Sequence, residues 1–205
     1  MKIKNIISFD MDQNCYLLYN EESMEGFLID PGIDTEKIIR GIKEEGVRVT
    51  HILLTHCHYD HSFSVNALRD GRKLVCGKNC AENIKNIGVS LSYYVGDEFV
   101  IDTPDIILSD NEEIEIAGIK VKMIETPGHT SCSVCYLAGS VLFSGDTLFR
   151  NNVGRWDLPT GDEETLKKSI KEKLYTLPSS TPVMCGHGHD TVIGHEMDYN
   201  FFINK

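Results

Sequence analysis

The sequence predicts an α/β domain in which helices cover mixed β-sheets. Three observations indicate this fold class. Strand-like and helix-like segments alternate along the chain, no linker of proline and serine interrupts them, and several strand-like segments end in a short polar motif flanked by glycine. Because α/β folds place their chemistry at the carboxyl ends of strands, these motifs also mark where a functional site is expected.

Two strands and a helix are expected first. Residues 15–19 and 26–29 are apolar and strand-like, and the second segment ends at the turn Asp30-Pro31-Gly32. The next segment carries isoleucines at helical spacing, with Asp34 as its expected N-cap and Gly46 where glycine favours the end of a helix. This order of elements places a helix between the second strand and the next one.

The following segments continue the alternation. Residues 49–54 form an apolar, partly β-branched run that indicates a buried strand, and the histidine-rich segment after it is expected on the loop that leaves this strand. A short helix is expected at 63–69 and a strand at 73–76.

The second half predicts two hairpins and a helix. From about 112 to 143 apolar residues alternate with polar ones, with turns near Ala117-Gly118 and Ala138-Gly139. A helix starts near Asp162 and has leucine and isoleucine at helical spacing, and Pro178 lies beyond its end. A last strand is expected at 182–185.

Composition limits the class of protein. With 205 residues, 41% of them apolar and 25% charged, the chain is typical of a globular protein, and residues 1–205 are expected to form a single domain. No secretory signal or membrane span is expected from the charged N-terminal residues, so the cytoplasm is the expected compartment. Acidic residues exceed basic ones by 31 to 20, for a net charge of −11, which argues against a nucleic-acid partner. The seven scattered cysteines are expected to be reduced thiols.

One segment concentrates metal-ligand chemistry. His56-Cys57-His58-Tyr59-Asp60-His61 places three imidazoles and a carboxylate within six residues. Neutral imidazole nitrogens and carboxylate oxygens are ligands that zinc, iron and manganese accept, and few other functions need so many of them together. The segment therefore predicts a metal site.

Three further candidates each follow a strand-like run. His129 ends Thr126-Pro127-Gly128-His129, Asp146 ends Ser144-Gly145-Asp146, and His187 lies in Gly186-His187-Gly188-His189. The flanking glycines let the backbone turn sharply and direct one polar side chain toward a shared cleft. By contrast, His51, His189 and His195 are expected to be structural residues, and the cysteines near these motifs to be buried packing residues, including the pair Cys132 and Cys135.

Taken together, these motifs resemble those of the metallo-beta-lactamase superfamily. The His-x-His-x-Asp-His signature is matched at 56–61, and the later ligands match at His129, Asp146 and His187, so that the resemblance covers about residues 14–196. It implies a four-layer αβ/βα sandwich with two mixed sheets. It also implies two divalent metal ions, zinc first and iron or manganese as alternatives: one held by His56, His58 and His129, the other by Asp60, His61 and His187, with Asp146 as the bridge. Such a pair of ions can lower the pKa of a bridging water for attack on a carbonyl, and Asp60 is the expected catalytic residue that steers this hydroxide or accepts its proton.

The motifs after Asp146 are similar to those of glyoxalase II-like hydrolases. The segments 144–149, 153–155 and 157–159 carry this resemblance, which implies a small thioester such as S-lactoylglutathione as substrate. Arg155 matches a basic residue that meets the anionic arm of the substrate, and a guanidinium can bind a carboxylate through two hydrogen bonds. Only a short tail follows His187, where full-length glyoxalase II enzymes have a helical domain that helps to hold glutathione.

Other functions stay open at this point. A persulfide dioxygenase uses one iron held by two histidines and an aspartate, which His56, His129 and Asp146 could supply. Hydrolysis of another small ester or a lactone is a further alternative. A secreted beta-lactamase is disfavoured because those enzymes commonly have cysteine at the position of Asp146. The expected partner is a small-molecule substrate, and the sequence predicts no oligomeric state.

Overall fold

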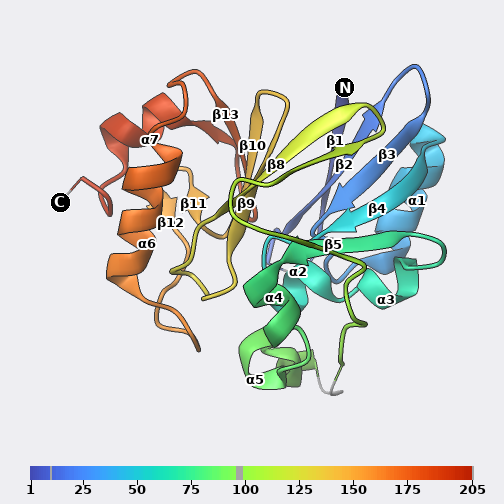
Figure 1. Cartoon of the computed structure of the whole chain (residues 1–205), viewed down its shortest axis with the longest axis horizontal. Coiled ribbons are helices and arrows are strands. Elements are labelled where there is room, and N and C mark those ends of the chain that lie inside the picture. The colour runs from blue at the N-terminus through green and yellow to red at the C-terminus, as the bar shows by residue number, and fades with distance from the viewer. Residues whose placement is uncertain (10, 96–98, 205) are drawn as a thin grey trace.

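The computed structural model describes residues 1–9, 11–95 and 99–204, and it has four layers (Figure 1). Two six-stranded sheets face each other, and helices cover the outer face of each. The predicted fold class, an αβ/βα sandwich with two mixed sheets, is therefore confirmed.

The first sheet contains the N-terminal strands in the order of the sequence. Strands β1 to β3 pair in antiparallel fashion, and β3 to β6 pair in parallel. Helical segments connect the parallel strands β3, β4 and β5, as parallel pairing requires. The strands are β1 (Lys2–Ile7), β2 (Asn14–Asn20), β3 (Glu25–Ile29), β4 (Arg48–Leu53), β5 (Lys73–Gly77) and β6 (Ile106–Leu108).

The second sheet has the order β14-β13-β10-β9-β8-β7 and contains one parallel pair, β10 with β13. Both predicted hairpins, β7–β8 and β9–β10, are present in it. Its strands are β7 (Glu113–Ile116), β8 (Ile119–Glu125), β9 (Val134–Ala138), β10 (Val141–Gly145), β13 (Pro182–Cys185) and β14 (Thr191–Val192). A separate small hairpin joins β11 (Leu148–Phe149) to β12 (Asn152–Val153).

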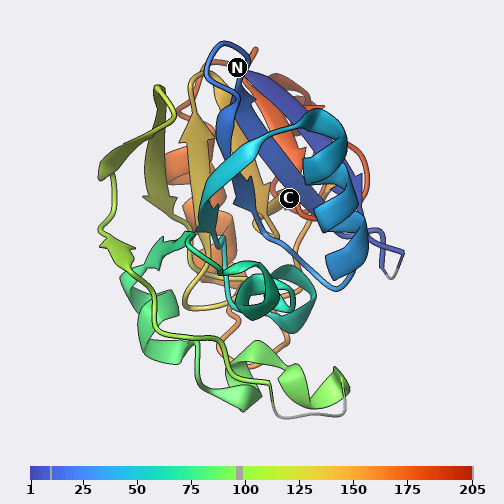
Figure 2. The ribbon, with the colours of Figure 1, turned by 90° about the vertical axis from the view of Figure 1, so that its right-hand side faces the viewer.

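The helices lie on the outer faces and around one end of the sheets. Figure 2 shows α1 in front of the first sheet, and Figure 1 shows α6 and α7 beside the second. The helices are α1 (Thr35–Glu45), α2 (Tyr59–Ser62), α3 (Val65–Leu68), α4 (Lys78–Asn83), α5 (Ile87–Ser90), a 3-10 turn η1 (Ser92–Val95), α6 (Glu163–Ser169), a π-helical turn η2 (Ile170–Leu174) and α7 (Ile193–Tyr199).

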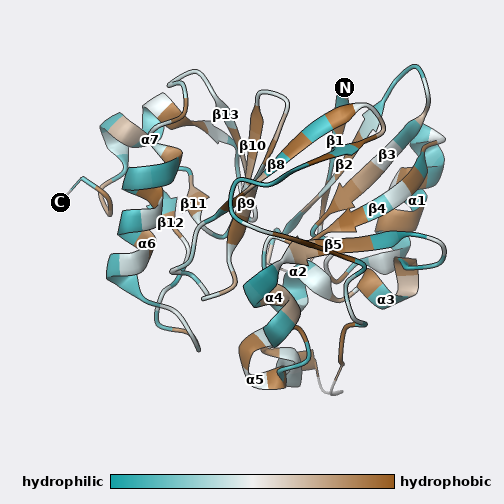
Figure 3. Cartoon of the chain, viewed as in Figure 1, coloured by the Kyte–Doolittle hydropathy of each residue, from teal (hydrophilic) through white to brown (hydrophobic). Residues whose placement is uncertain are grey.

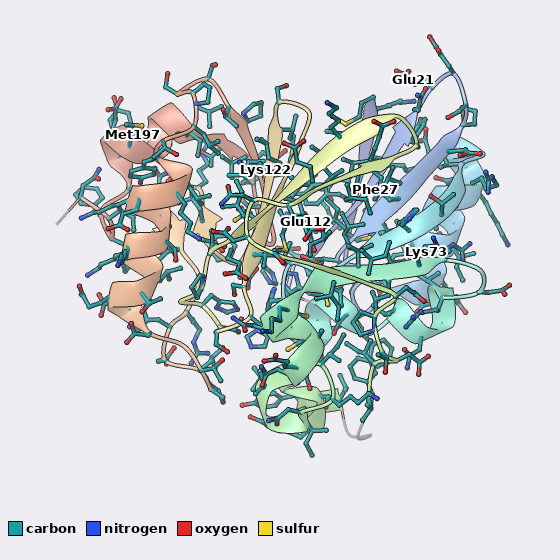
Figure 4. All side chains as sticks on the ribbon, viewed as in Figure 1. Glu21, Phe27, Lys73, Glu112, Lys122 and Met197 are labelled. Atoms are coloured by element: carbon teal, nitrogen blue, oxygen red, sulfur yellow. The ribbon has the colours of Figure 1, made fainter. Side chains whose placement is uncertain are left out.

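Strand alternation explains why the layers form. Along β2, Leu17 and Tyr19 point into the core under the helices, whereas Tyr16 and Leu18 point into the core between the sheets. Phe27, labelled in Figure 4, also lies between the sheets and is fully buried. A strand with apolar residues on both faces is stable only when other parts of the fold cover both faces. Figure 3 shows the result, with strands largely brown and the helices banded with teal.

Several local expectations are corrected by the structure. Asp34 stands at the N-cap of α1 but its side chain makes no capping hydrogen bond, because its carboxylate accepts from the backbone N–H of Phe9. The helix expected at 63–69 is present as the shorter α3, within the expected range. The helical turn α2 was not predicted, and it places Asp60 and His61 on a helical turn instead of the loop. Gly46 ends α1 in the left-handed conformation (φ 68°), and Asp162 caps α6, both as predicted.

The strand β1 and the helix α7 were not predicted. Both lie at an edge of the fold: β1 is the edge strand of the first sheet, and α7 follows β14, the edge strand of the second. No helix in the described ranges is long and apolar enough to cross a membrane.

Candidate metal centre

The seven residues predicted as ligands meet where the carboxyl ends of four strands converge. His56 and His58 follow β4 of the first sheet, and Asp60 and His61 lie in the helical turn α2 that comes next. The other three residues, His129, Asp146 and His187, follow β8, β10 and β13 of the second sheet. The site therefore depends on both sheets.

Three histidines form the first group. The nitrogen atoms that His56, His58 and His129 offer lie within 4.8 Å of one another. His58 Nδ1 is 3.0 Å from His129 Nε2, and the centroids of the three rings are 4.7 to 4.9 Å apart. All three side chains are buried.

Two histidines and a carboxylate form the second group. Asp60, His61 and His187 also offer atoms within 4.8 Å of one another. Nε2 of His61 is 3.1 Å from Nε2 of His187, which in turn is 3.2 Å from Oδ2 of Asp60. His187 is the more open of the two histidines, so this group faces the surface.

The carboxylate of Asp146 lies between the two groups. Its Oδ1 is 3.2 Å from Nε2 of His61, and its Oδ2 is 3.6 Å from Nε2 of His129 and 3.5 Å from Nε2 of His187. One carboxylate thus contacts histidines of both groups, as a bridging ligand must.

The outward nitrogen of three imidazoles is held by a specific partner. Nδ1 of His129 is 2.6 Å from the carbonyl oxygen of Arg155, and Nδ1 of His187 is 2.9 Å from that of Met11. A carbonyl only accepts, so Nδ1 of both rings carries the proton and Nε2 presents its lone pair to the centre. His56 Nδ1 lies 3.0 Å from the hydroxyl of Thr55.

Asp30 orders both groups, and sequence reasoning missed it. Its buried carboxylate accepts from the backbone N–H and the hydroxyl of Thr55 (2.8 and 2.6 Å) and lies 3.0 Å from Nδ1 of His61. Because the Thr55 hydroxyl donates to Asp30, its oxygen is free to accept from Nδ1 of His56. The backbone of Asp30 is left-handed (φ 50°), a conformation that aspartate tolerates better than most residues. A polar residue at a strand end before a turn was the available signal.

Burial favours the neutral imidazole at His56 and His58. Burial lowers the pKa of His58 to about 4, and burial together with the neighbouring His61 lowers the pKa of His56 well below its usual value. Burial opposes ionisation of Asp146, but His61 and His187 hold the pKa of this carboxyl well below its usual value. His56 and His58 therefore offer neutral nitrogen donors beside an ionised carboxylate. In the second group, burial lowers the pKa of His61 and His187, but the carboxylates of Asp146 and Asp60 outweigh it and raise the pKa of both.

The donor set fits a divalent metal. Nε2 of His56 and Oδ1 of Asp146 are buried and have no hydrogen-bond partner among the described residues. Buried polar atoms without a partner are costly, and a cation at the centre would satisfy both. Imidazole nitrogen and carboxylate oxygen are also the donors preferred by zinc and by the other first-row ions.

Two glycines make the close packing possible. A Cβ on Gly186 would lie 2.2 Å from Oδ1 of Asp146, and a Cβ on Gly154 would lie 1.9 Å from the carbonyl oxygen of Asp146. No side chain fits at either position. The loop that contains Gly154 can therefore approach His129 closely enough for the carbonyl of Arg155 to accept its hydrogen bond.

A cavity of about 430 Å³ opens above the centre. Asp60, Asp146 and His187 lie in its wall, and Arg155, predicted to bind substrate, lies there too. The guanidinium of Arg155 is already bound to both oxygens of Asp157, at 2.9 Å each.

The remaining histidines and the cysteines lie outside the two groups. His51 bonds to Thr50 and His195 to Asn151, and His189 is exposed. All seven cysteines are free and buried. Cys132 and Cys135 are both buried, as expected of packing residues, and they belong to different cores: Cys132 lies in the loop before β9 and Cys135 in β9 itself.

Comparison with known proteins agrees with this geometry. The family model described as "Metallo-beta-lactamase superfamily" matches residues 9–189. The hydroxyacylglutathione hydrolase GloC of Haemophilus influenzae is 34% identical, with 100% of this chain and 99% of that protein covered.

Solved structures are similar over the same length. BLEG-1 B3 metallo-beta-lactamase is 35% identical with a TM-score of 0.92, and all of both chains is covered. The structure of TTHA1623 in a di-iron-bound form is 30% identical with a TM-score of 0.80, and covers 97% of this chain and 99% of that one.

Proposed function

The chain belongs to the metallo-beta-lactamase superfamily of metal-dependent hydrolases, and we propose that it uses two divalent metal ions to hydrolyse a small thioester such as S-lactoylglutathione or a related acyl thiol. The observation that carries this proposal is the position of the Asp146 carboxylate between two groups of donors.

Each ion has its own group of ligands in this proposal. His56, His58 and His129 hold one ion, and Asp60, His61 and His187 hold the other. Asp146 belongs to both. Zinc is our first choice of metal, with iron or manganese as alternatives, because all three accept imidazole and carboxylate donors. The di-iron form of TTHA1623 supports the idea that two ions fit such a site.

Bound ions supply the Lewis acidity that lowers the pKa of water and polarises an acyl carbonyl. The protein supplies position and proton transfer. Asp60 lies in the cavity wall with Oδ2 3.2 Å from Nε2 of His187, where it can orient the attacking water and accept its proton. The Nδ1 contacts of His129 and His187 with backbone carbonyls keep the rings in the orientation that faces the centre.

The thioester is the best-supported substrate. The relative named hydroxyacylglutathione hydrolase matches this chain over its full length, and the cavity leads from the surface to the ligands of both groups. An acyl group can enter this cavity with its carbonyl toward the centre while the thiol arm lies along the outer wall.

The test compares substrates on protein of known metal content. Purified protein loaded with zinc, iron or manganese is assayed on S-lactoylglutathione for thiol release, on a β-lactam and a lactone for ring opening, and on glutathione persulfide for oxygen uptake. We expect release of thiol that requires metal and is lost in Asp60→Ala. Oxygen uptake without thioester cleavage would contradict the hydrolase. It would favour instead a dioxygenase with one iron held by His56, His129 and Asp146.

A further inference from the structure

The outer wall of the cavity carries little net charge. Met11, Leu91, Phe149, Val153 and Leu158 make it largely apolar, and Arg155 is the one lysine or arginine among the described residues that line it. Whatever part of a substrate extends beyond the scissile bond meets this wall. Whether the positive charge of Arg155 is compensated therefore decides how strongly the wall binds an anionic group.

The charge of Arg155 is compensated within its own loop. Its Nε and Nη2 donate to the two carboxylate oxygens of Asp157, at 2.9 Å each. This arrangement uses one whole edge of the guanidinium and both acceptor oxygens. Arg155 and Asp157 are 68% and 62% exposed, so the pair is at the rim and can be reached by ligand and by salt.

The backbone fixes the pair at the rim. The carbonyl oxygen of Arg155 accepts from Nδ1 of His129, and Gly154 lets the chain pass against the carbonyl of Asp146. Asp157 is only two residues further along the same loop. The short loop therefore keeps the two side chains within reach of each other.

We propose that Asp157 is a specificity-determining residue: by neutralising Arg155, it removes the advantage that a free guanidinium would give to an anionic thiol arm, so that the site accepts uncharged arms as readily as the anionic arm of S-lactoylglutathione. This inference rests on the proposed thioester hydrolysis and widens the class of thiol that suits the site. An anionic arm must either displace Asp157 or bind beside a neutral pair. An uncharged arm needs neither, because it contacts the apolar part of the wall.

The expected effect is moderate because the pair is exposed. Exposed ion pairs are weak and are screened by salt, so removal of the Asp157 charge frees Arg155 without disturbing the fold. We expect Asp157→Asn to tighten binding of an anionic ligand by about three- to tenfold at low salt.

The experiment measures binding of two matched thioethers, which cannot be hydrolysed. S-Hexylglutathione carries net negative charge, and S-hexyl-N-acetylcysteamine is uncharged. Dissociation constants are measured by isothermal titration calorimetry on metal-loaded wild type, Asp157→Asn, Arg155→Gln and the double variant. Glu163→Gln is the matched control, because it also removes one negative charge from an exposed ion pair, that with Lys167 on α6.

The proposal requires a specific pattern. Asp157→Asn should bind S-hexylglutathione three- to tenfold more tightly and the uncharged thioether within twofold of wild type. The gain should disappear in 0.5 M NaCl and in the double variant, and Glu163→Gln should show none of it.

Four results would overturn the proposal. Unchanged or weaker binding of S-hexylglutathione to Asp157→Asn would mean that Asp157 instead orients Arg155 for the anion. An equal gain in affinity for both thioethers, or an equal gain in Glu163→Gln, would show that the charge of Asp157 beside Arg155 is not the cause. Failure of both thioethers to bind any variant would show that the rim does not bind the thiol arm. Absence of thioester turnover in wild type would refute the proposed function but leave these binding constants as a separate result.

Discussion

Replacing Asp30 by asparagine should weaken metal binding although Asp30 is not a proposed ligand. The carboxylate accepts three hydrogen bonds, from the N–H and hydroxyl of Thr55 and from Nδ1 of His61, and it is 2% exposed. Asparagine keeps the size of the side chain and tolerates the left-handed backbone (φ 50°) of this position. The substitution therefore changes hydrogen bonding with little change in shape.

The substitution replaces one acceptor oxygen of the carboxylate by an NH₂ donor. The amide oxygen of asparagine can still accept from the Thr55 N–H, but the NH₂ group then faces the Thr55 hydroxyl and Nδ1 of His61. An NH₂ group can only donate, so it favours the His61 tautomer in which Nδ1 is unprotonated and the proton sits on Nε2, the atom that faces the centre. Loss of such an outer partner typically costs 10- to 100-fold in metal affinity. A buried donor left without its acceptor costs about 2 kcal/mol, or roughly 4 to 8 °C in Tm for a chain of this size.

The assay measures zinc affinity by competition with a chromophoric chelator, with Tm from circular dichroism. Asp110→Asn is the control, because Asp110 also accepts a backbone N–H and a side-chain donor, from Glu125 and Lys173. We expect one of the two zinc ions to bind at least tenfold more weakly in Asp30→Asn. In Asp110→Asn, the affinity for both zinc ions should equal that of wild type. A folded Asp30→Asn protein that binds both zinc ions within twofold of wild type would refute the reasoning about the His61 tautomer.

Three further predictions concern the bridge, the last helix and acid stability. Asp146→Ala should lose most bound metal and activity because one carboxylate contacts both donor groups, and two retained ions by elemental analysis would contradict the assigned bridge. Glu196→Ala should lower stability to urea by at least about 2 kcal/mol, because the fully buried carboxylate accepts from the Asn151 N–H, the Thr191 hydroxyl and the Asn200 amide; a midpoint equal to that of wild type would show that these donors find other partners. The Tyr19 hydroxyl, with Lys4 and Lys2, lowers the pKa of Glu45 to about 2, so its stabilisation is present above its ordinary pKa of 4.5 and is lost as pH falls toward 2. Glu45→Gln should therefore be less stable than wild type at pH 7 and match it near pH 2 in thermal scans, and a gap that does not change with pH would exclude this ion pair as its source.

Much of the fold was predictable because the central strands have apolar residues on both faces. β2 and β4 are examples, and their bounds agree with the expected segments to within one residue at the ends that matter for the site. β1 was missed because Lys2–Ile7 is an edge strand with lysines in its sequence, and only one of its residues is buried. α7 was missed because its burial depends on Glu196, a carboxylate whose partners lie elsewhere in the chain.

The seven candidate ligands could be identified from the sequence because metal binding demands particular side chains, and here they follow particular strands. The structure brings all seven together, and it places Arg155 at the rim of the same cavity. The four partners that orient the imidazoles were not predictable in the same way. Two are backbone carbonyls, at Met11 and Arg155, which any residue type could supply. The other two are the Thr55 hydroxyl and the carboxylate of Asp30, whose sequence context indicates only a turn.

In our proposal, the loop 154–157 links the candidate metal centre to the choice of substrate through different atoms of one residue. The carbonyl oxygen of Arg155 fixes the ring of His129, whereas its side chain forms the rim pair with Asp157. Because the main-chain carbonyl orients the ring of His129, the side chains at 155 and 157 can change without loss of this orientation. Gly154 cannot change in this way, since a Cβ there would meet the carbonyl of Asp146. Variation in substrate is therefore expected at the rim positions, while the glycine and the two carbonyl contacts must stay fixed for the histidines to face the centre.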